Sequence, residues 1–266
     1  MNDVLRIDAD GVGLVAEVVG AGRALLFVHG FPLDRTMWRH QMAGIDGWKR
    51  IAPDLRGAGQ SAVPTAGYSM ARYADDLVRV LDAVGTPTAV CCGLSMGGYI
   101  LFELLRRHRD RVRALILCDT KSEADTPEGM RGRDELAAVA RRDGTGAVAA
   151  RLVPKLLGRS TASRDPAVVE TVRTMVLRSP VDGVVGALEA MRDRPDSTPL
   201  LAQIDVPTLV LVGADDELTP PAVVRPLAER IPGATFQEIA AAGHMAPLER
   251  PDAVTPALAE FLATVR

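Results

Sequence analysis

The sequence predicts an α/β protein in which a mostly parallel sheet is covered by helices, and three observations support this fold class. Short apolar runs recur along the chain, as expected for strands that are buried on both faces. Amphipathic patterns of helical period lie between these runs. Strand and helix therefore alternate, which is typical of a doubly wound sheet.

The expected elements follow in chain order. Residues 4–7 and 12–19 flank Asp10-Gly11, a good hairpin turn, so the chain should begin with an antiparallel ribbon. The clearest helix covers residues 69–84, where apolar side chains form one stripe and Asp75, Asp76, Arg79 and Asp82 lie on the other. The expected central strands are residues 24–28, 50–52, 89–92, 114–118 and 208–212, and residues 235–239 form a further strand-like run.

The alternation stops between residues 122 and 199. Helical patterns over residues 136–140, 168–177 and 184–191 are broken there by glycine and proline. We interpret this stretch as a helical insertion in one domain, because 266 residues can bury a single core. The expected division is a core in two parts, residues 1–121 and 199–266, with the insertion over 122–198.

Composition indicates a soluble globular protein without a polyanionic partner, since 47% of residues are apolar and the formal net charge is only −3. The arginine-rich run 106–113 is interpreted as a solvated helix end and not as a nucleic-acid surface. No segment approaches the roughly 18 uncharged apolar residues that cross a bilayer, and the first residues do not resemble a signal peptide, so no membrane association and a cytoplasmic location are expected. The three cysteines lie in apolar runs and should be core residues. The sequence does not indicate an oligomeric state.

The candidate nucleophile is Ser95, which lies between a predicted strand and an apolar helical pattern over residues 99–105. Its surroundings, Gly93-Leu94-Ser95-Met96-Gly97-Gly98, fit the pattern G-x-S-x-G. A sharp turn from strand to helix needs glycines two positions to either side, and it pushes the serine hydroxyl into a cleft. The helix that begins here directs its free N–H groups towards the site, which favours a developing oxyanion. An incidental glycine-rich turn is the alternative for so short a pattern.

Serine needs a base to take its proton, and His244 is the best candidate among four histidines. It follows the strand-like run 235–239, and Gly243 gives its loop the freedom to reach the carboxyl-end edge of the sheet, where ligands bind in open α/β folds. A histidine that is merely packed in a loop is the alternative.

The base in turn needs an acceptor on its other ring nitrogen. Acids at positions 215–217 follow the predicted strand 208–212, and Thr219 is expected to cap the next helix ahead of two prolines. Such a run of acids is often only a solvated loop. The chain order favours a function, because serine, then aspartate, then histidine is the order used by G-x-S-x-G enzymes of this architecture.

The oxyanion needs a second N–H donor from the loop after the third strand. We expect the backbone N–H groups of Phe31 and Met96 to form this oxyanion hole. His29 should shape the loop through a hydrogen bond. His40 and His108 lie in predicted helices and should be surface residues.

These segments together resemble the α/β-hydrolase superfamily, over nearly the whole chain. The matching segments are His29-Gly30-Phe31-Pro32, residues 53–61, the turn at Ser95, residues 213–220 and Gly243-His244. The family pattern G-x-x-D-x-x-T-P places the acid at Asp216 and not at Asp215. The resemblance implies an eight-stranded, mostly parallel sheet with helices on both faces, and a helical cap over the pocket formed by residues 122–198.

The resemblance also implies that Asp54 and Arg56 are structural or rim residues. Ala58 stands where the family often has histidine or an aromatic residue, which leaves that loop less specific. Asp119 is the alternative acid, because some members carry it after the strand that ends near residue 118. Within the superfamily the chain most resembles the small lactonases and carboxylesterases, including the 3-oxoadipate enol-lactonases, on the basis of Gly-Leu-Ser-Met-Gly-Gly-Tyr and Gly-His-Met-Ala-Pro-Leu-Glu.

The expected function is therefore hydrolysis of a small-molecule carboxylic ester or lactone through an acyl-enzyme. Ser95 would attack the carbonyl, His244 would transfer the proton and Asp216 would orient His244. No metal or organic cofactor is needed. A cofactor-free haloperoxidase or perhydrolase, or a C–C hydrolase or lyase, would use the same three residues, and a catalytically inert binding protein of the same fold is the non-enzymatic alternative.

The predicted insertion helices contain no aromatic residue. Their larger apolar side chains either attach the insertion to the core or line the cleft, in which case the acid part of the substrate is small to medium and apolar. These side chains are Leu136, Val139, Val148, Leu152, Val153, Leu156, Leu157, Met175, Leu177, Leu188 and Met191.

Overall fold

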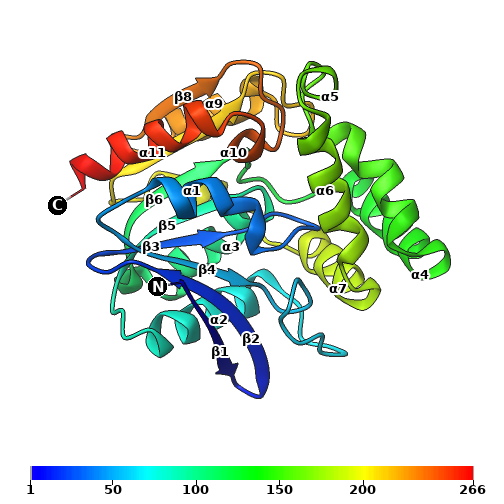
Figure 1. Ribbon diagram of the computed structural model, residues 1–266, viewed down its shortest axis with the longest axis horizontal. Coiled ribbons are helices and arrows are strands. Elements are labelled where there is room, and N and C mark those ends of the chain that lie inside the picture. Colours follow the sequence, from blue (N-terminus) through cyan, green and yellow to red (C-terminus); the bar gives the residue numbers. More distant parts are fainter. Residues whose placement is uncertain (1, 266) are drawn as a thin grey trace.

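Apolar runs form strands at the predicted places, with small extensions at their ends. Over residues 2–265, which the computed structural model describes, eight strands form one sheet in the order β1-β2-β4-β3-β5-β6-β7-β8 (Figure 1). β2 is antiparallel to both of its neighbours, and all the other pairs are parallel. The strands are β1 (Asn2–Ala9), β2 (Val12–Val19), β3 (Ala24–Val28), β4 (Lys49–Asp54), β5 (Ala89–Leu94), β6 (Val112–Cys118), β7 (Thr208–Gly213) and β8 (Thr235–Ile239).

Helices cover both faces of this sheet, so the predicted fold class is confirmed (Figure 1). Every residue of β3, β5 and β7 is buried, as expected for parallel strands between two helical layers. The α-helices are α1 (Arg39–Gly44), α2 (Met70–Ala83), α3 (Met96–Arg107), α4 (Pro127–Leu156), α5 (Thr161–Arg164), α6 (Pro166–Arg178), α7 (Val181–Arg192), α8 (Thr198–Leu201), α9 (Pro221–Glu229), α10 (Ala246–Glu249) and α11 (Pro251–Thr264), and two short 3-10 helices are η1 (Arg35–Trp38) and η2 (Arg109–Arg111).

Local sequence explains the elements that were predicted most closely. Asp10 and Gly11 both have positive φ, of 53° and 87°, and form the tight turn between β1 and β2. Ser69 caps α2, since its hydroxyl accepts a hydrogen bond from the Arg72 N–H at 3.1 Å. The three cysteines are buried and unpaired, as expected.

Asp76 departs from the prediction of a solvated stripe on α2. Its side chain is buried, and its carboxylate forms a bidentate pair with the guanidinium of Arg56 at 2.5 and 2.6 Å. The other members of the predicted stripe, Asp75, Arg79 and Asp82, are partly or fully exposed, whereas Asp76 lies among the buried positions of α2 and faces the loop after β4. A buried charge needs such a partner, because desolvation without one is costly.

The helices α4 to α7 lie between β6 and β7, inside residues 122–198, and they project to one side of the sheet (Figure 1). α4 runs through Pro154 and is kinked at Gly144, where φ is 75° and ψ is −177°. The sequence predicted a helical pattern over residues 136–140 and an alanine-rich composition that favours helix over residues 137–150, and the observed helical stretch begins earlier, at Pro127. The non-helical backbone of Gly144 separates two helical segments of α4, and α4 packs against α6 and α7. α8 spans the expected boundary between residues 198 and 199.

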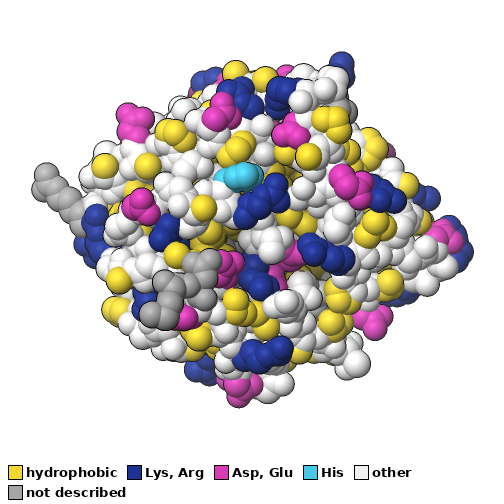
Figure 2. Space-filling model, in the orientation of Figure 1, with side chains coloured by type: hydrophobic (Ala, Val, Ile, Leu, Met, Phe, Trp, Pro, Cys, Tyr) yellow, Lys and Arg dark blue, Asp and Glu magenta, His cyan; other side chains and the backbone are white. Residues whose placement is uncertain are grey.

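The surface mixes charges of both signs. Figure 2 shows acidic and basic side chains interspersed over one face of the molecule, without a large patch of a single sign. In the described part of the chain no helix has both the length and the apolar character needed to span a membrane.

Two of the four histidines lie at the surface. His40 lies in α1 and is partly exposed. His108 was predicted to be helical but follows the last residue of α3, where its Nε2 bonds with the Asp75 carboxylate at 2.7 Å.

Candidate active site

Ser95 occupies a strained turn between β5 and α3. Its φ is 53° and its ψ is −112°, in a region that residues with side chains rarely adopt. The flanking glycines are needed for close approach: a Cβ on Gly93 would lie 2.7 Å from the Gly97 carbonyl carbon, and one on Gly97 would lie 2.4 Å from the Val28 carbonyl oxygen. The turn therefore has the geometry that the G-x-S-x-G pattern predicts.

The end of β6 holds this turn in place. The Ser95 N–H donates to the Cys118 carbonyl at 2.9 Å, and the Thr120 hydroxyl donates to the Ser95 carbonyl at 2.8 Å. Sequence reasoning did not identify Thr120. Its only signal was its place two residues after a buried strand, which many residues share.

Asp216 and His244 form a buried hydrogen-bonded pair at the carboxyl ends of β7 and β8. The Nδ1 of His244 lies 2.8 Å from Oδ2 of Asp216, and both side chains are at most 3% exposed. Asp216 also accepts hydrogen bonds from the N–H groups of Leu218 and Thr219, at 2.8 and 3.0 Å, and from the Thr219 hydroxyl at 2.7 Å. Asp215 instead links the two loops through its backbone N–H, which donates to the Ala242 carbonyl.

Thr219 therefore has a different role from the predicted one. The N-cap of α9 is Pro220, which provides no side-chain cap. The Thr219 hydroxyl turns towards the Asp216 carboxylate and lies 3.3 Å from Nδ1 of His244. A threonine near a helix start is a capping signal in sequence, but the neighbouring buried carboxylate competes for the same hydroxyl.

The electrostatics of this pair favour a charged aspartate. Burial on its own would raise the pKa of Asp216, but the charge of His244 and the hydrogen bonds from His244 and Thr219 outweigh it and lower the pKa to about 2. Asp216 therefore stays ionised throughout the neutral range, and an ionised carboxylate is the group that can hold Nδ1–H in place.

Asp119, the alternative acid, lies beside the pair but does not contact His244 through a hydrogen bond. Its Oδ1 accepts the Gly213 N–H at 2.8 Å, while its buried Oδ2 has no partner. Ligand atoms of Asp119, Asp216 and His244 all lie within 4.8 Å of one another, a spacing that could also accommodate a metal ion. Burial and the nearby Asp216 raise the pKa of Asp119 well above its usual range, which favours its neutral form.

The loop after β3 lies against the turn at Ser95. A Cβ on Gly30 would lie 3.5 Å from the Ser95 Cβ, which places the backbone of Phe31 next to the serine. His29 shapes this loop as predicted: its Nδ1 bonds with the Gly30 carbonyl at 2.9 Å, and its Nε2 accepts the Leu55 N–H at 3.0 Å. Burial lowers the pKa of His29, which keeps the ring neutral.

Asp54 and Arg56 are held in structural contacts, as the resemblance implied. The Asp54 carboxylate accepts the N–H groups of Arg35 and Gln60, at 2.9 and 2.8 Å, and pairs with the Arg35 guanidinium. A Cβ on Gly59 would lie 2.2 Å from this carboxylate. These contacts fold the loop after β4 against the loop after β3.

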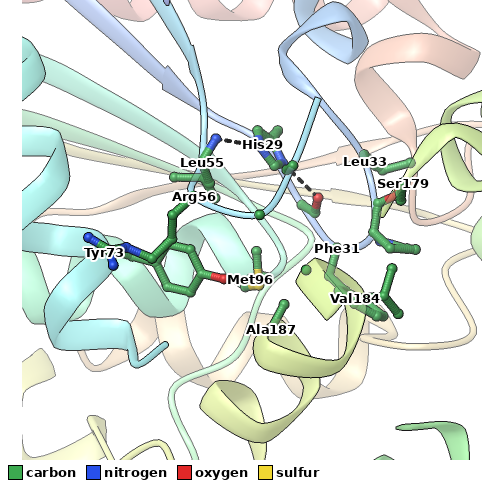
Figure 3. Close-up of a pocket in the computed structure, with 15 residues that line it drawn as sticks. His29, Phe31, Leu33, Leu55, Arg56, Tyr73, Met96, Ser179, Val184 and Ala187 are labelled. Carbon is green, nitrogen blue, oxygen red and sulfur yellow. Dashed lines mark hydrogen bonds between the residues drawn. The ribbon is translucent and has the colours of Figure 1, made fainter. Parts of the chain in front are cut away.

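A pocket adjoins Phe31 and Met96 (Figure 3). His29 and Leu55 line it from the core, and Val184 and Ala187 line it from α7. Among the described lining residues Arg56 carries the formal charge, and Asp76 neutralises it. The full lining is His29, Gly30, Phe31, Pro32, Leu33, Leu55, Arg56, Gly57, Ala58, Tyr73, Met96, Ser179, Gly183, Val184 and Ala187.

The larger apolar side chains expected in the insertion do not line this pocket in the described chain. Most of them are buried within the insertion, whereas Leu177 is exposed. The insertion lines the pocket with small residues instead, Gly183, Val184 and Ala187, because α7 approaches the core closely. A Cβ on Gly183 would lie 1.8 Å from the Gly57 carbonyl oxygen.

Gly243 offers a test of how tightly the histidine loop is packed. A Cβ there would lie 2.2 Å from the Gly158 backbone nitrogen, and backbone cannot move aside cheaply. We expect Gly243→Ala to lower the free energy of unfolding by about 1–3 kcal/mol. Gly132→Ala, in exposed α4 with nothing within 4 Å, should raise it by about 0.5–1 kcal/mol. Urea unfolding measures the free energy of unfolding of both variants. Equal values for Gly243→Ala and Gly132→Ala would contradict the close packing at Gly243.

Comparison with known proteins agrees with this architecture. A family model described as alpha/beta hydrolase fold matches residues 23–251, so the chain belongs to that family. A thermophilic esterase from Thermogutta terrifontis, in a malate-bound structure, is 42% identical, with a TM-score of 0.95 over 99% of both chains. The enol-lactonase from Burkholderia xenovorans LB400 is 29% identical, with a TM-score of 0.91 over 97% of this chain and all of the other.

Curated relatives are similar over the same length. The AB hydrolase superfamily protein YisY of Bacillus subtilis is 31% identical over 262 residues, which cover 94% of this chain and 95% of the relative. A non-heme chloroperoxidase, CPO-A1 of Kitasatospora aureofaciens, is 28% identical over 88% of this chain and 90% of its own. The chain is thus a member of a hydrolase family whose esterases, lactonases and haloperoxidases share its fold.

Proposed function

We propose that this protein is a serine hydrolase that cleaves a carboxylic ester or lactone. The observation that carries the proposal is the buried Asp216–His244 pair at the edge of the sheet where Ser95 stands on a strained turn. The carboxyl ends of parallel strands meet at that edge: Ser95 directly follows β5, and Asp216 and His244 lie in the loops after β7 and β8. The similarity to esterases and an enol-lactonase supports this assignment.

In this mechanism His244 takes the Ser95 proton at Nε2 while Nδ1–H remains bonded to the ionised Asp216. The serine oxygen attacks the carbonyl carbon, and the N–H groups of Phe31 and Met96 stabilise the oxyanion. His244 then gives the proton to the leaving alcohol oxygen. A water molecule, deprotonated by the same histidine, then attacks the acyl carbonyl carbon. As the bond to Ser95 breaks, His244 returns that proton to the Ser95 oxygen and the acid leaves.

Pocket chemistry favours a substrate with a small, uncharged acyl part. The walls are largely apolar, and the buried Arg56–Asp76 pair carries no net charge. The enol-lactone of 3-oxoadipate retains a free carboxylate, for which the described lining offers no unpaired cation. We therefore propose neutral esters and lactones as the substrate class, with residues 122–198 acting as a cap that closes the pocket through α7.

Labelling with a fluorophosphonate probe tests the nucleophile, and a substrate panel tests the reaction. We expect one covalent adduct, on Ser95, and faster hydrolysis of neutral short acyl esters and lactones than of analogues with a carboxylate on the acyl side. The perhydrolase alternative would be favoured if the protein formed peracid from acetate and hydrogen peroxide faster than it hydrolysed esters. The similarity to a non-heme chloroperoxidase is the reason to include this measurement. An unlabelled Ser95 would favour the inert binding protein.

A further inference from the structure

Glu249 is a buried carboxylate that the proposed mechanism does not use. It ends α10, five residues after His244, and is 6% exposed. Its Oε1 accepts the backbone N–H groups of Gly243 and Met245, at 2.9 and 3.1 Å. These are the residues on either side of His244, so one oxygen of Glu249 holds the segment that carries the imidazole.

The other oxygen of Glu249 holds the insertion. Its Oε2 accepts the Gly158 N–H at 2.8 Å and a hydrogen bond from the buried Thr161 hydroxyl. Both donors lie at the junction of α4 and α5, about ninety residues away in sequence. A single carboxylate therefore ties this junction to the histidine loop.

The two segments are also in direct backbone contact. A Cβ on Gly243 would lie 2.6 Å from the Leu157 carbonyl carbon, and one on Gly158 would lie 2.9 Å from the Gly243 nitrogen. No side chain separates them, so a shift of the junction displaces the histidine loop as well. Close-packed groups of this kind transmit displacement and do not absorb it.

We propose that Glu249 is a positioning residue that couples the seating of the α4–α5 junction to the placement of His244. The proposal rests on the proposed function, in which His244 is the base. Four donors converge on one carboxylate from two segments, and satisfying them all requires both segments to be in register. The packing of the α4–α5 junction against the histidine loop then determines the position of the His244 imidazole relative to Ser95.

Glu249→Gln tests this coupling with little change in shape. The amide offers one acceptor oxygen and one NH₂ donor, so two of the four donors would face another donor. We expect kcat for a small neutral ester to fall by about tenfold to a hundredfold, because small displacements of a catalytic group have effects of this size. KM should change little, since Glu249 does not line the pocket. Glu260→Gln, which removes an exposed carboxylate, should have wild-type kinetics.

Substitutions of Thr161 distinguish the proposed coupling from a general loss of stability. Thr161→Val deletes only the hydroxyl on the insertion side and should lower kcat by about threefold to tenfold, an effect of about 1 kcal/mol. Thr161→Ser keeps the hydroxyl and should restore the rate. In a protein that already carries Glu249→Gln, Thr161→Val should lower kcat by a much smaller factor, because both substitutions remove the same hydrogen bond between Thr161 and Glu249.

The melting temperature of each variant shows whether a change in kcat reflects catalysis or loss of folded protein. Wild-type kcat in folded Glu249→Gln, or strictly additive effects of the two substitutions, would overturn the coupling. If Glu249→Gln does not fold, equal kcat values for Thr161→Val and Thr161→Ser would overturn the proposed coupling. Failure of the proposed function is a distinct result, since the wild-type protein would then show no labelling of Ser95 and no ester hydrolysis.

Discussion

Ser95→Ala is expected to abolish ester hydrolysis, with a fall in kcat of about 10⁴-fold or more. The variant loses the nucleophile but keeps the oxyanion donors and the pocket, so residual binding should survive. The alanine methyl occupies the space of the serine Cβ, and the backbone hydrogen bonds of the turn to Cys118 and Thr120 do not involve the hydroxyl. Steady-state kinetics with a p-nitrophenyl ester measure the effect.

Ser163→Ala is the matched control, because Ser163 is exposed in α5 and bonds only locally, to the Ser160 carbonyl. It should retain wild-type kcat and fluorophosphonate labelling. Full esterase activity in Ser95→Ala would mean that another group attacks the carbonyl, and the assignment of the site would then be wrong.

Asp216→Asn is expected to lower kcat by about 10⁴-fold, because an amide that donates a hydrogen bond to Nδ1 forces the wrong tautomer on His244. The carboxylate is held ionised by His244 and Thr219, with a pKa of about 2 despite its burial. It does not titrate between pH 5 and 9, so protonation of Asp216 itself adds no pH dependence to wild-type kcat in that range, and the loss in Asp216→Asn should persist throughout it. Measurement of kcat at several pH values checks both the size of the loss and its persistence.

Asp119→Asn is the matched comparison at the neighbouring acid. Burial and the nearby Asp216 raise the pKa of Asp119 well above the usual range, which favours a neutral wild-type side chain. Asparagine has the same shape and still accepts the Gly213 N–H through Oδ1. We expect kcat to stay within about threefold of wild type. A large loss in Asp119→Asn with a small loss in Asp216→Asn would reverse the two roles.

Much of the site could be predicted because its causes are local in sequence. The turn at Ser95 needs glycine at 93 and 97, and no other residue fits the close approach of the backbones there. The loop at Gly30 and Phe31 follows a strand whose apolar composition is unambiguous. Asp76 and Thr219 show the limit of this reasoning. Each has a sensible local role, as a solvated helix residue and as a helix cap, which a buried partner from another segment replaces.

The sequence by itself determined the alternation of strands and helices, the hairpin at Asp10-Gly11 and the strained serine turn, because each depends on neighbouring residues and on backbone conformations that few side chains tolerate. Only the tertiary structure decided which acid meets His244, which small residues of the insertion line the pocket, and that Glu249 joins the insertion to the histidine loop. The Asp216–His244 and Gly158–Glu249 hydrogen bonds link residues 28 and 91 positions apart, and such contacts depend on the packing of distant segments whose relative placement no local pattern encodes.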